Sequence, residues 1–254
     1  MAVGNPIYSA YERRLFRQLR DKPLPRHVAV MLDGNRRWAR QRGAGTDEGY
    51  RAGADNIEHL LTWCEEVGVE VVTLWLLSTD NLVGRTAEEL GPLLEIIENV
   101  VGELAGTGRW RINMMGALDL LPEATAERLQ EASARTTEVD GLLVNIAVGY
   151  GGRREITDAV RALITDHAAR GASIEEVVQA IDVDNISDYL YTKGQPDPDL
   201  VIRTSGEQRI SGFLMWQSAH TEFYFCEAYW PDFRRVDFLR ALRAYGDRHR
   251  RFGG

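Results

Sequence analysis

An aspartate and three arginines directly follow an apolar run near the start of the chain. The run from His27 to Leu32 predicts a strand, and Asp33-Gly34-Asn35-Arg36-Arg37-Trp38 after it opens a predicted helix. Free N–H groups at a helix start bind phosphate oxygens, and arginines add charge and forked donors. A carboxylate beside phosphate requires a cation between them, so Asp33 predicts Mg²⁺ bound to a diphosphate. The alternative is an Asp-Gly turn followed by a solvated face of arginines.

A second polar cluster follows another apolar run far along the chain. The run from Leu200 to Thr204 contains Arg203 and leads into Ser205-Gly206-Glu207-Gln208-Arg209-Ile210-Ser211. In an open parallel sheet, ligands gather outside the carboxyl ends of the strands, so the two clusters are predicted to share one crevice. For each arginine taken alone, the alternative is an ordinary surface salt bridge.

Several ordered motifs closely resemble the cis-prenyltransferases, the family typified by undecaprenyl diphosphate synthase. The resemblance spans roughly Pro25 to the C-terminus and is closest to the short-chain actinobacterial (2Z,6E)-farnesyl diphosphate synthases. The motifs that carry it are the segment from His27 to Trp38, Ser78-Thr79-Asp80-Asn81, the segment from Asn145 to Arg153, the segment from Arg203 to Arg209, Trp230-Pro231-Asp232-Phe233 and Arg251-Phe252-Gly253.

The resemblance implies a reaction in which isopentenyl diphosphate condenses with an allylic prenyl diphosphate. Asp33 would hold Mg²⁺ and act on the leaving diphosphate, and Glu222 resembles a second metal-site carboxylate. The residues that would bind the two diphosphates are Gly34, Asn35, Arg36, Arg37 and Trp38 on the allylic side and Arg203, Arg209, Ile210 and Ser211 on the isopentenyl side.

Four consecutive residues, Ser78-Thr79-Asp80-Asn81, are expected by resemblance nearest the carbon chemistry. Asn81 stands at the position often named as proton acceptor. An amide is a poor base, so Asn81 is interpreted as an orienting group while Asp80 or a departing phosphate oxygen takes the proton. Arg85 is expected to bind substrate, although one extra residue before it leaves its alignment with the family arginine open.

This chain departs from the long-chain members of the family at several positions. Thr46, Tyr50, Gln208 and Leu82 stand where those enzymes typically carry Arg, His, His and Trp. Leu76 stands where they carry a small Ala, at the end of a predicted strand, and is predicted to block the space for a growing prenyl chain. The alternative is that Leu76 only packs the sheet against a helix. The blocking interpretation predicts one condensation with geranyl diphosphate and a fifteen-carbon product.

Composition and periodicity predict one α/β domain with a six-stranded, mostly parallel sheet flanked by helices, and the resemblance implies the undecaprenyl diphosphate synthase-like fold. The predicted strands are His27 to Leu32, Val69 to Leu77, Arg111 to Gly116, Leu142 to Val148, Leu200 to Thr204 and Phe223 to Cys226. The predicted helices are Tyr50 to Val67, Glu88 to Leu104, Glu123 to Glu138, Arg154 to Ala169, Ile174 to Ala180 and Asp237 to Arg248.

Charge and hydropathy exclude several classes of protein. The net charge of −8 argues against nucleic-acid binding, and no run approaches the length of a membrane span. The start of the chain lacks the apolar stretch of a signal peptide, so a cytoplasmic protein is predicted. Cys64 and Cys226 lie in apolar periodic segments and are predicted to be buried free thiols.

The first 24 residues are predicted to form a helical extension before the cis-prenyltransferase domain of residues 25–254. Apolar and basic residues alternate there at helical spacing, which fits either a helix on an anionic membrane surface or one docked on its own domain or a partner subunit. The resemblance implies a homodimer in which the terminal Arg251-Phe252-Gly253 reaches diphosphate. Three alternative functions are a long-chain polyprenyl diphosphate synthase, an irregular coupling enzyme on the same fold, and a non-catalytic partner subunit, which would lose Asp33 and its arginines.

Overall fold

A six-stranded, fully parallel sheet forms the centre of the protein in the computed structural model, which describes residues 6–249. The strand order is β3-β4-β2-β1-β5-β6, and each neighbouring pair is parallel. All six predicted strands are confirmed, and their ends differ from the prediction by at most two residues. The strands are β1 His27–Met31, β2 Val71–Ser78, β3 Arg111–Met115, β4 Leu143–Tyr150, β5 Leu200–Arg203 and β6 Glu222–Phe225.

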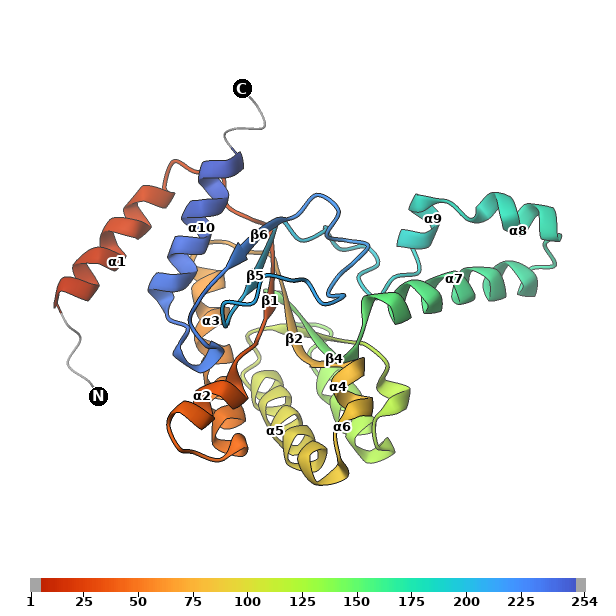
Figure 1. Cartoon of the computed structure of the whole chain (residues 1–254). Coiled ribbons are helices and arrows are strands. Elements are labelled where there is room, and N and C mark those ends of the chain that lie inside the picture. The colour runs from red at the N-terminus through yellow and green to blue at the C-terminus, as the bar shows by residue number, and fades with distance from the viewer. Residues whose placement is uncertain (1–5, 250–254) are drawn as a thin grey trace.

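Helices connect the strands and cover the sheet (Figure 1). They are α1 Pro6–Leu19, α2 Asn35–Gln41, α3 Thr46–Glu66, α4 Thr79–Gly84, α5 Ala87–Gly106, α6 Glu123–Ala134, α7 Gly152–Ala169, α8 Ile174–Ala180, α9 Val183–Ser187 and α10 Arg235–His249, with 3₁₀ turns at Leu118–Leu120 and Trp230–Asp232. The short helices α4 and α9 were not predicted, because five or six residues carry too little periodicity.

Two predicted helix limits were wrong by four residues. The helix predicted to begin at Tyr50 begins at Thr46, and the other error is at the end of a helix. The helix predicted from Glu123 to Glu138 ends at Ala134. The hydroxyl of Thr136 donates to the carbonyl of Ser133 at 2.8 Å and accepts from the N–H of Ile112 at 2.9 Å. This threonine therefore ends the helix and attaches the following turn to β3, a role that its spacing in the sequence does not reveal.

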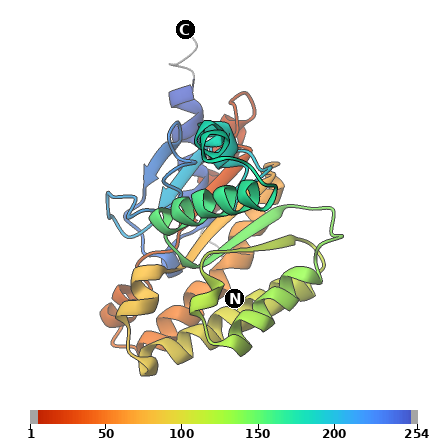
Figure 2. The ribbon, with the colours of Figure 1, turned by 90° about the vertical axis from the view of Figure 1, so that its right-hand side faces the viewer.

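The two faces of the sheet are covered differently. One face carries the main core, in which α3, α5, α6 and α10 pack on the strands. A smaller cluster on the other face includes Trp75, Tyr150 and Phe213, and the indole of Trp75 stacks on the ring of Phe213 at 5.0 Å. The helices α7, α8 and α9 extend away from the body as an arm (Figures 1 and 2). Both cysteines are buried and free, as predicted.

The N-terminal helix α1 lies against α10 and not apart from the domain (Figure 1). Leu15 and Leu19 of α1 are buried in the main core, and the guanidinium of Arg240 lies over the ring of Tyr11 at 5.3 Å. Of the two alternatives, docking on its own domain is the one observed. Contact with a membrane surface stays a prediction. Over residues 6–249, no helix is long and apolar enough to cross a membrane.

His27, the first residue of β1, makes the stability of the fold depend on pH. Its ring nitrogens lie 2.8 Å from the carbonyl oxygen of Pro196 and 2.8 Å from the hydroxyl of Thr73. Burial lowers the pKa of His27 from 6.5 to about 4, which outweighs the opposing effect of the Pro196 carbonyl. Between these two pH values the unfolded chain binds a proton that the folded chain does not, so stability falls as the pH drops.

We therefore expect the His27 imidazole to lower the free energy of unfolding by about 2 kcal/mol between pH 7 and pH 5. Urea unfolding of the wild type and of His27→Gln at both pH values measures this difference. The variant is expected to be less stable at pH 7 but to lose less stability on acidification. An equal loss in both proteins would contradict a neutral buried His27.

Candidate active site at the carboxyl ends of the strands

A polar pocket of about 640 Å³ opens where β1, β2 and β5 end. These strands are neighbours in the sheet, so segments distant in sequence meet at this edge, as predicted from the parallel pattern. Six arginines and three carboxylates line the pocket, giving a local charge of +3 in a chain of net charge −8. The charged lining residues are Arg36, Arg37, Arg40, Arg85, Arg203, Arg209, Asp33, Asp80 and Glu207.

Gly34 forms the tight turn between β1 and α2. Its φ of +107° is one that residues with a side chain rarely adopt, and it stands at the N-cap of α2. A Cβ at this position would lie 2.6 Å from the ring of Tyr229 and 3.1 Å from the Cβ of Ser205. Glycine is thus required both by conformation and by space, and it allows the start of α2 to lie against the end of β5. The predicted helix start at this position is confirmed.

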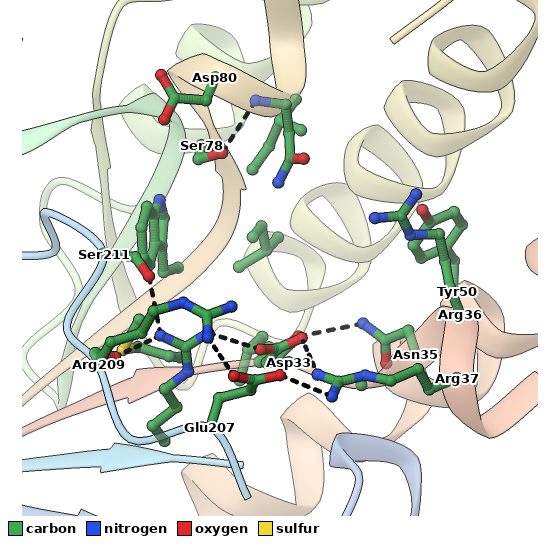
Figure 3. Close-up of a pocket in the computed structure, with 18 of the residues that line it drawn as sticks. Asp33, Asn35, Arg36, Arg37, Tyr50, Ser78, Asp80, Glu207, Arg209 and Ser211 are labelled. Carbon is green, nitrogen blue, oxygen red and sulfur yellow. Dashed lines mark hydrogen bonds and ion pairs between the residues drawn. The ribbon is translucent and has the colours of Figure 1, made fainter. Parts of the chain in front are cut away.

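Asp33 lies between two arginines (Figure 3). Its Oδ2 accepts from Arg203 at 2.9 Å, and its Oδ1 accepts from Arg37 at 3.2 Å. Partial burial alone would raise the pKa of Asp33, but the hydrogen bond and charge of Arg203, with the charge of Arg37, outweigh it and lower the pKa. The carboxylate is therefore ionised at neutral pH and lines the pocket as an anion.

Arg203 is buried and holds the end of β5 in place. Besides Asp33, it donates to the hydroxyl of Ser211 at 3.0 Å and to the carbonyl oxygen of Arg209. Its Nε is buried without a hydrogen-bond partner. The neighbouring Thr204 hydroxyl joins the two strand ends, since it donates to the Asp33 carbonyl at 2.7 Å and accepts from the Asp33 N–H at 2.9 Å. Asp33 and Arg203 are thus held together through both backbone and side chains.

Glu207 connects the two arginine clusters and was not predicted as a site residue. Its carboxylate accepts from Arg37 at 3.0 Å and also pairs with Arg209 (Figure 3). Two successive residues with positive φ, Ser205 at +79° and Gly206 at +75°, turn the chain just before it. The sequence signal was an acidic residue between two arginines in the segment that follows β5.

The opposite wall of the pocket comes from the end of β2 and from α4. The hydroxyl of Ser78 accepts from the N–H of Asn81 at 3.0 Å and so caps α4. Asp80 and Asn81 are exposed and line the pocket, as does Arg85 just beyond the helix. Asp80 lies on the side of the pocket opposite Asp33 (Figure 3), and Asn81 lines the same pocket.

An apolar cavity of about 40 Å³ adjoins the pocket and lies between α3, α5 and β2. Leu76 lines both the pocket and this cavity. The pairing of β2 with β4 is irregular here, because Trp75 pairs with Ala147 while Leu77 pairs with Val148, which leaves Leu76 as an extra residue. Leu76 packs partly against the main core, on the same face as Val72 and Leu74. After the bulge, Leu77 is buried in that core as well, so the alternation of the strand is broken at Leu77.

Four residues that the sequence placed at the site do not line the pocket. The hydroxyl of Thr79 donates to the Gly149 carbonyl at 3.0 Å, and the ring of Trp38 lies under the guanidinium of Arg42. Ile210 and Glu222 are also absent from the lining. Glu222 is the first residue of β6, so it lies at the amino ends of the strands, whereas Asp33 follows the carboxyl end of β1. Its carboxylate pairs with Arg248 at 2.9 Å.

Comparison with known proteins gives consistent results. A family profile with the description "Putative undecaprenyl diphosphate synthase" matches residues 31–253. A (2Z,6E)-farnesyl diphosphate synthase of Thermobifida fusca is 64% identical over 249 residues, covering 98% of this chain and 97% of that protein. A protein of the same name from Mycobacterium tuberculosis is 56% identical over 257 residues, covering 99% of this chain and 97% of that protein.

The fold is also similar to a solved structure. Lavandulyl diphosphate synthase from Lavandula x intermedia, in complex with dimethylallyl diphosphate, has a TM-score of 0.80 and 33% sequence identity, and the match covers 87% of this chain and 95% of that chain. The predicted fold and the predicted resemblance are both confirmed. The chain, whose strand ends gather Asp33 and the arginines in one pocket, belongs to the undecaprenyl diphosphate synthase family of cis-prenyltransferases.

Proposed function

We propose that this protein condenses isopentenyl diphosphate with geranyl diphosphate to give (2Z,6E)-farnesyl diphosphate. The observation that carries the proposal is one pocket of local charge +3 that adjoins a small apolar cavity at Leu76. The arginines match two diphosphates, and the apolar side matches a short prenyl tail. The names of the relatives from Thermobifida fusca and Mycobacterium tuberculosis support the same product.

The residues divide the work of the reaction between them. A bond forms between C4 of isopentenyl diphosphate and C1 of the allylic substrate, while the bond from C1 to the diphosphate oxygen breaks and pyrophosphate leaves. Arg36, Arg37 and the turn at Gly34 and Asn35 would hold the leaving diphosphate in fixed positions, so that no reorganisation is needed as charge builds. Arg209 and Ser211 would hold the isopentenyl diphosphate on the other side, with Arg203 buried behind them.

The proton lost from C2 of isopentenyl diphosphate needs an acceptor. Asp80 and the departing diphosphate oxygens are the candidates, because the Asn81 amide has no basic site at neutral pH. Asn81 would orient the substrate from the exposed start of α4, where the Ser78 cap fixes it. Arg85, on the same wall, would add a further cation for diphosphate.

We propose Mg²⁺ as the cofactor, held by Asp33. Mg²⁺ binds through one or two carboxylates and completes its coordination with phosphate oxygens and water, which fits an ionised Asp33 in a pocket for diphosphates. Over residues 6–249, no group of three His, Cys, Asp or Glu side chains forms a metal cage. When bound, the metal neutralises charge on the leaving diphosphate. A metal role for Glu222 stays a prediction from the resemblance.

A homodimer is also part of the proposal. The arm of α7 to α9 exposes apolar side chains that a second copy would cover, with Ile174, Val178 and Val183 each more than half exposed. The proposed role of Arg251-Phe252-Gly253 at the diphosphate falls outside the described residues.

Product analysis tests both the activity and the role of Leu76. Purified protein with Mg²⁺, isopentenyl diphosphate and geranyl diphosphate should yield a fifteen-carbon product and stop. Leu76 lines both the pocket and the apolar cavity, so it lies where a longer prenyl tail would have to extend. Forcing a further unit past the leucine costs roughly 1–3 kcal/mol through overpacking, or more if the wall is rigid.

Leu76→Ala should therefore lengthen the product, which mass spectrometry of the extracted prenyl alcohols detects. An unchanged fifteen-carbon product would place the stop elsewhere in the cavity wall. Long products from the wild type would instead favour a long-chain synthase, and failure of the purified chain to react would favour a non-catalytic subunit.

A further inference from the structure

The passage from the polar pocket to the apolar cavity is formed by only four of the described residues. Leu32, Asn35, Tyr50 and Leu76 line both spaces. Leu32 and Asn35 belong to the end of β1 and the start of α2, where the tight turn at Gly34 fixes the backbone. The two large side chains that remain are Leu76, on the bulge of β2, and Tyr50, on α3.

The ring of Tyr50 also contacts a cation. The guanidinium of Arg85 lies over its ring, with Cζ 5.5 Å from the ring centroid, which is within the range of a cation–π contact. The Nε and one terminal nitrogen of Arg85 are buried and have no hydrogen-bond partner. Leaving buried donors unpaired costs free energy, so these donors call for an acceptor that the protein does not supply. Since Arg85 lines the diphosphate pocket, a phosphate oxygen is such an acceptor.

We propose that Tyr50 is a specificity-determining residue that acts in two ways. Its bulk, with Leu76, closes the passage to the apolar cavity and so limits the length of the allylic chain. Its ring face holds Arg85 ready for diphosphate, so one side chain couples the fit of the tail to the binding of the head group. This inference rests on the proposed prenyl transfer and extends it to a residue whose type had been noted only as a departure from the family pattern.

The two roles make different demands on the side chain, and two variants separate them. Tyr50→Leu keeps an apolar branched side chain in the passage but removes the ring under Arg85. The Michaelis constant for geranyl diphosphate should rise roughly 3- to 30-fold, the range of cation–π contacts from exposed to desolvated, while the product stays at fifteen carbons. Tyr50→Ala removes both features, so the same constant should rise and the product should also lengthen.

Two further variants serve as controls. Tyr50→Phe retains the ring and should rescue both the Michaelis constant and the product length relative to Tyr50→Ala. Tyr229 offers a matched position, because its ring carries the guanidinium of Arg37 at 5.6 Å but does not line the apolar cavity. Tyr229→Leu should therefore leave the product at fifteen carbons.

The measurements are steady-state kinetics with geranyl and farnesyl diphosphate as alternative primers, and mass spectrometry of the products. For Tyr50→Ala, the ratio of kcat/KM for farnesyl over geranyl diphosphate should rise above that of the wild type. An unchanged ratio with an unchanged product would overturn the inference while wild-type condensation still upholds the proposed function. If the wild type itself fails to condense these substrates, the proposed function falls, and the inference falls with it.

Discussion

Asp33→Asn is expected to lower kcat/KM by about 100- to 1000-fold, corresponding to roughly 2.7–4 kcal/mol of lost transition-state stabilisation. The substitution keeps the size of the side chain but removes the negative charge that would hold Mg²⁺ at the leaving diphosphate. Asp33 is ionised because Arg203 and Arg37 outweigh the effect of its burial and lower its pKa. Kinetics across a Mg²⁺ titration measure the loss, and turnover close to the wild-type rate at saturating metal would refute the assignment.

A control must separate a loss of catalysis in Asp33→Asn from a loss of stability. Arg203 and Arg37 would each lose a charged partner in Asp33→Asn, so thermal unfolding should be compared in wild type and variant. Glu70→Gln supplies a matched acidic-to-amide change, since its carboxylate pairs with Arg26 at 2.8 Å in an exposed position away from the pocket. Its effect on stability should be small, as for most exposed ion pairs.

Arg203→Ala should impair the enzyme more broadly than Arg209→Ala. The Arg203 side chain is 5% exposed and donates to both Asp33 and Ser211, whereas that of Arg209 is 62% exposed. Removing Arg203 takes the buried partner from the Asp33 carboxylate and the donor from the Ser211 hydroxyl, so both sides of the pocket lose a fixed contact. We expect Arg203→Ala to lower kcat and to raise the Michaelis constants of both substrates, while Arg209→Ala raises mainly that of isopentenyl diphosphate.

Arg37→Ala completes this comparison from the allylic side. A residue that contacts one diphosphate weakens that substrate far more than the other, so Arg37→Ala should act mainly on geranyl diphosphate. Initial rates over a matrix of both substrate concentrations separate the constants. Equal effects of Arg37→Ala and Arg209→Ala on both substrates would contradict the two-site assignment. Glu207 pairs with both arginines, so it would then explain why each substitution affects both substrates.

Much of the pocket was predictable because its chemistry lies in short segments. Asp33, Gly34 and Arg37 stand together after β1, and Arg203, Arg209 and Ser211 stand together after β5. Tyr50 and Glu207 line the pocket but were not predicted as site residues. Tyr50 comes from α3, and Glu207 is an acidic residue in a site for anions, a role that appears only once its two arginine partners are placed.

The sequence by itself determined the order of strands and helices, the parallel sheet and the family, because these follow from local periodicity and from the motifs. The tertiary structure decided what lies face to face. Asp33 meets Arg203 across 170 positions of the chain, and Leu76 has no partner in β4 because the pairing of β2 with β4 shifts at this point. Glu222 lies at the amino ends of the strands because it begins β6, while the pocket that contains Asp33 forms at their carboxyl ends. Such distances depend on the packing of the whole sheet, which no local pattern encodes.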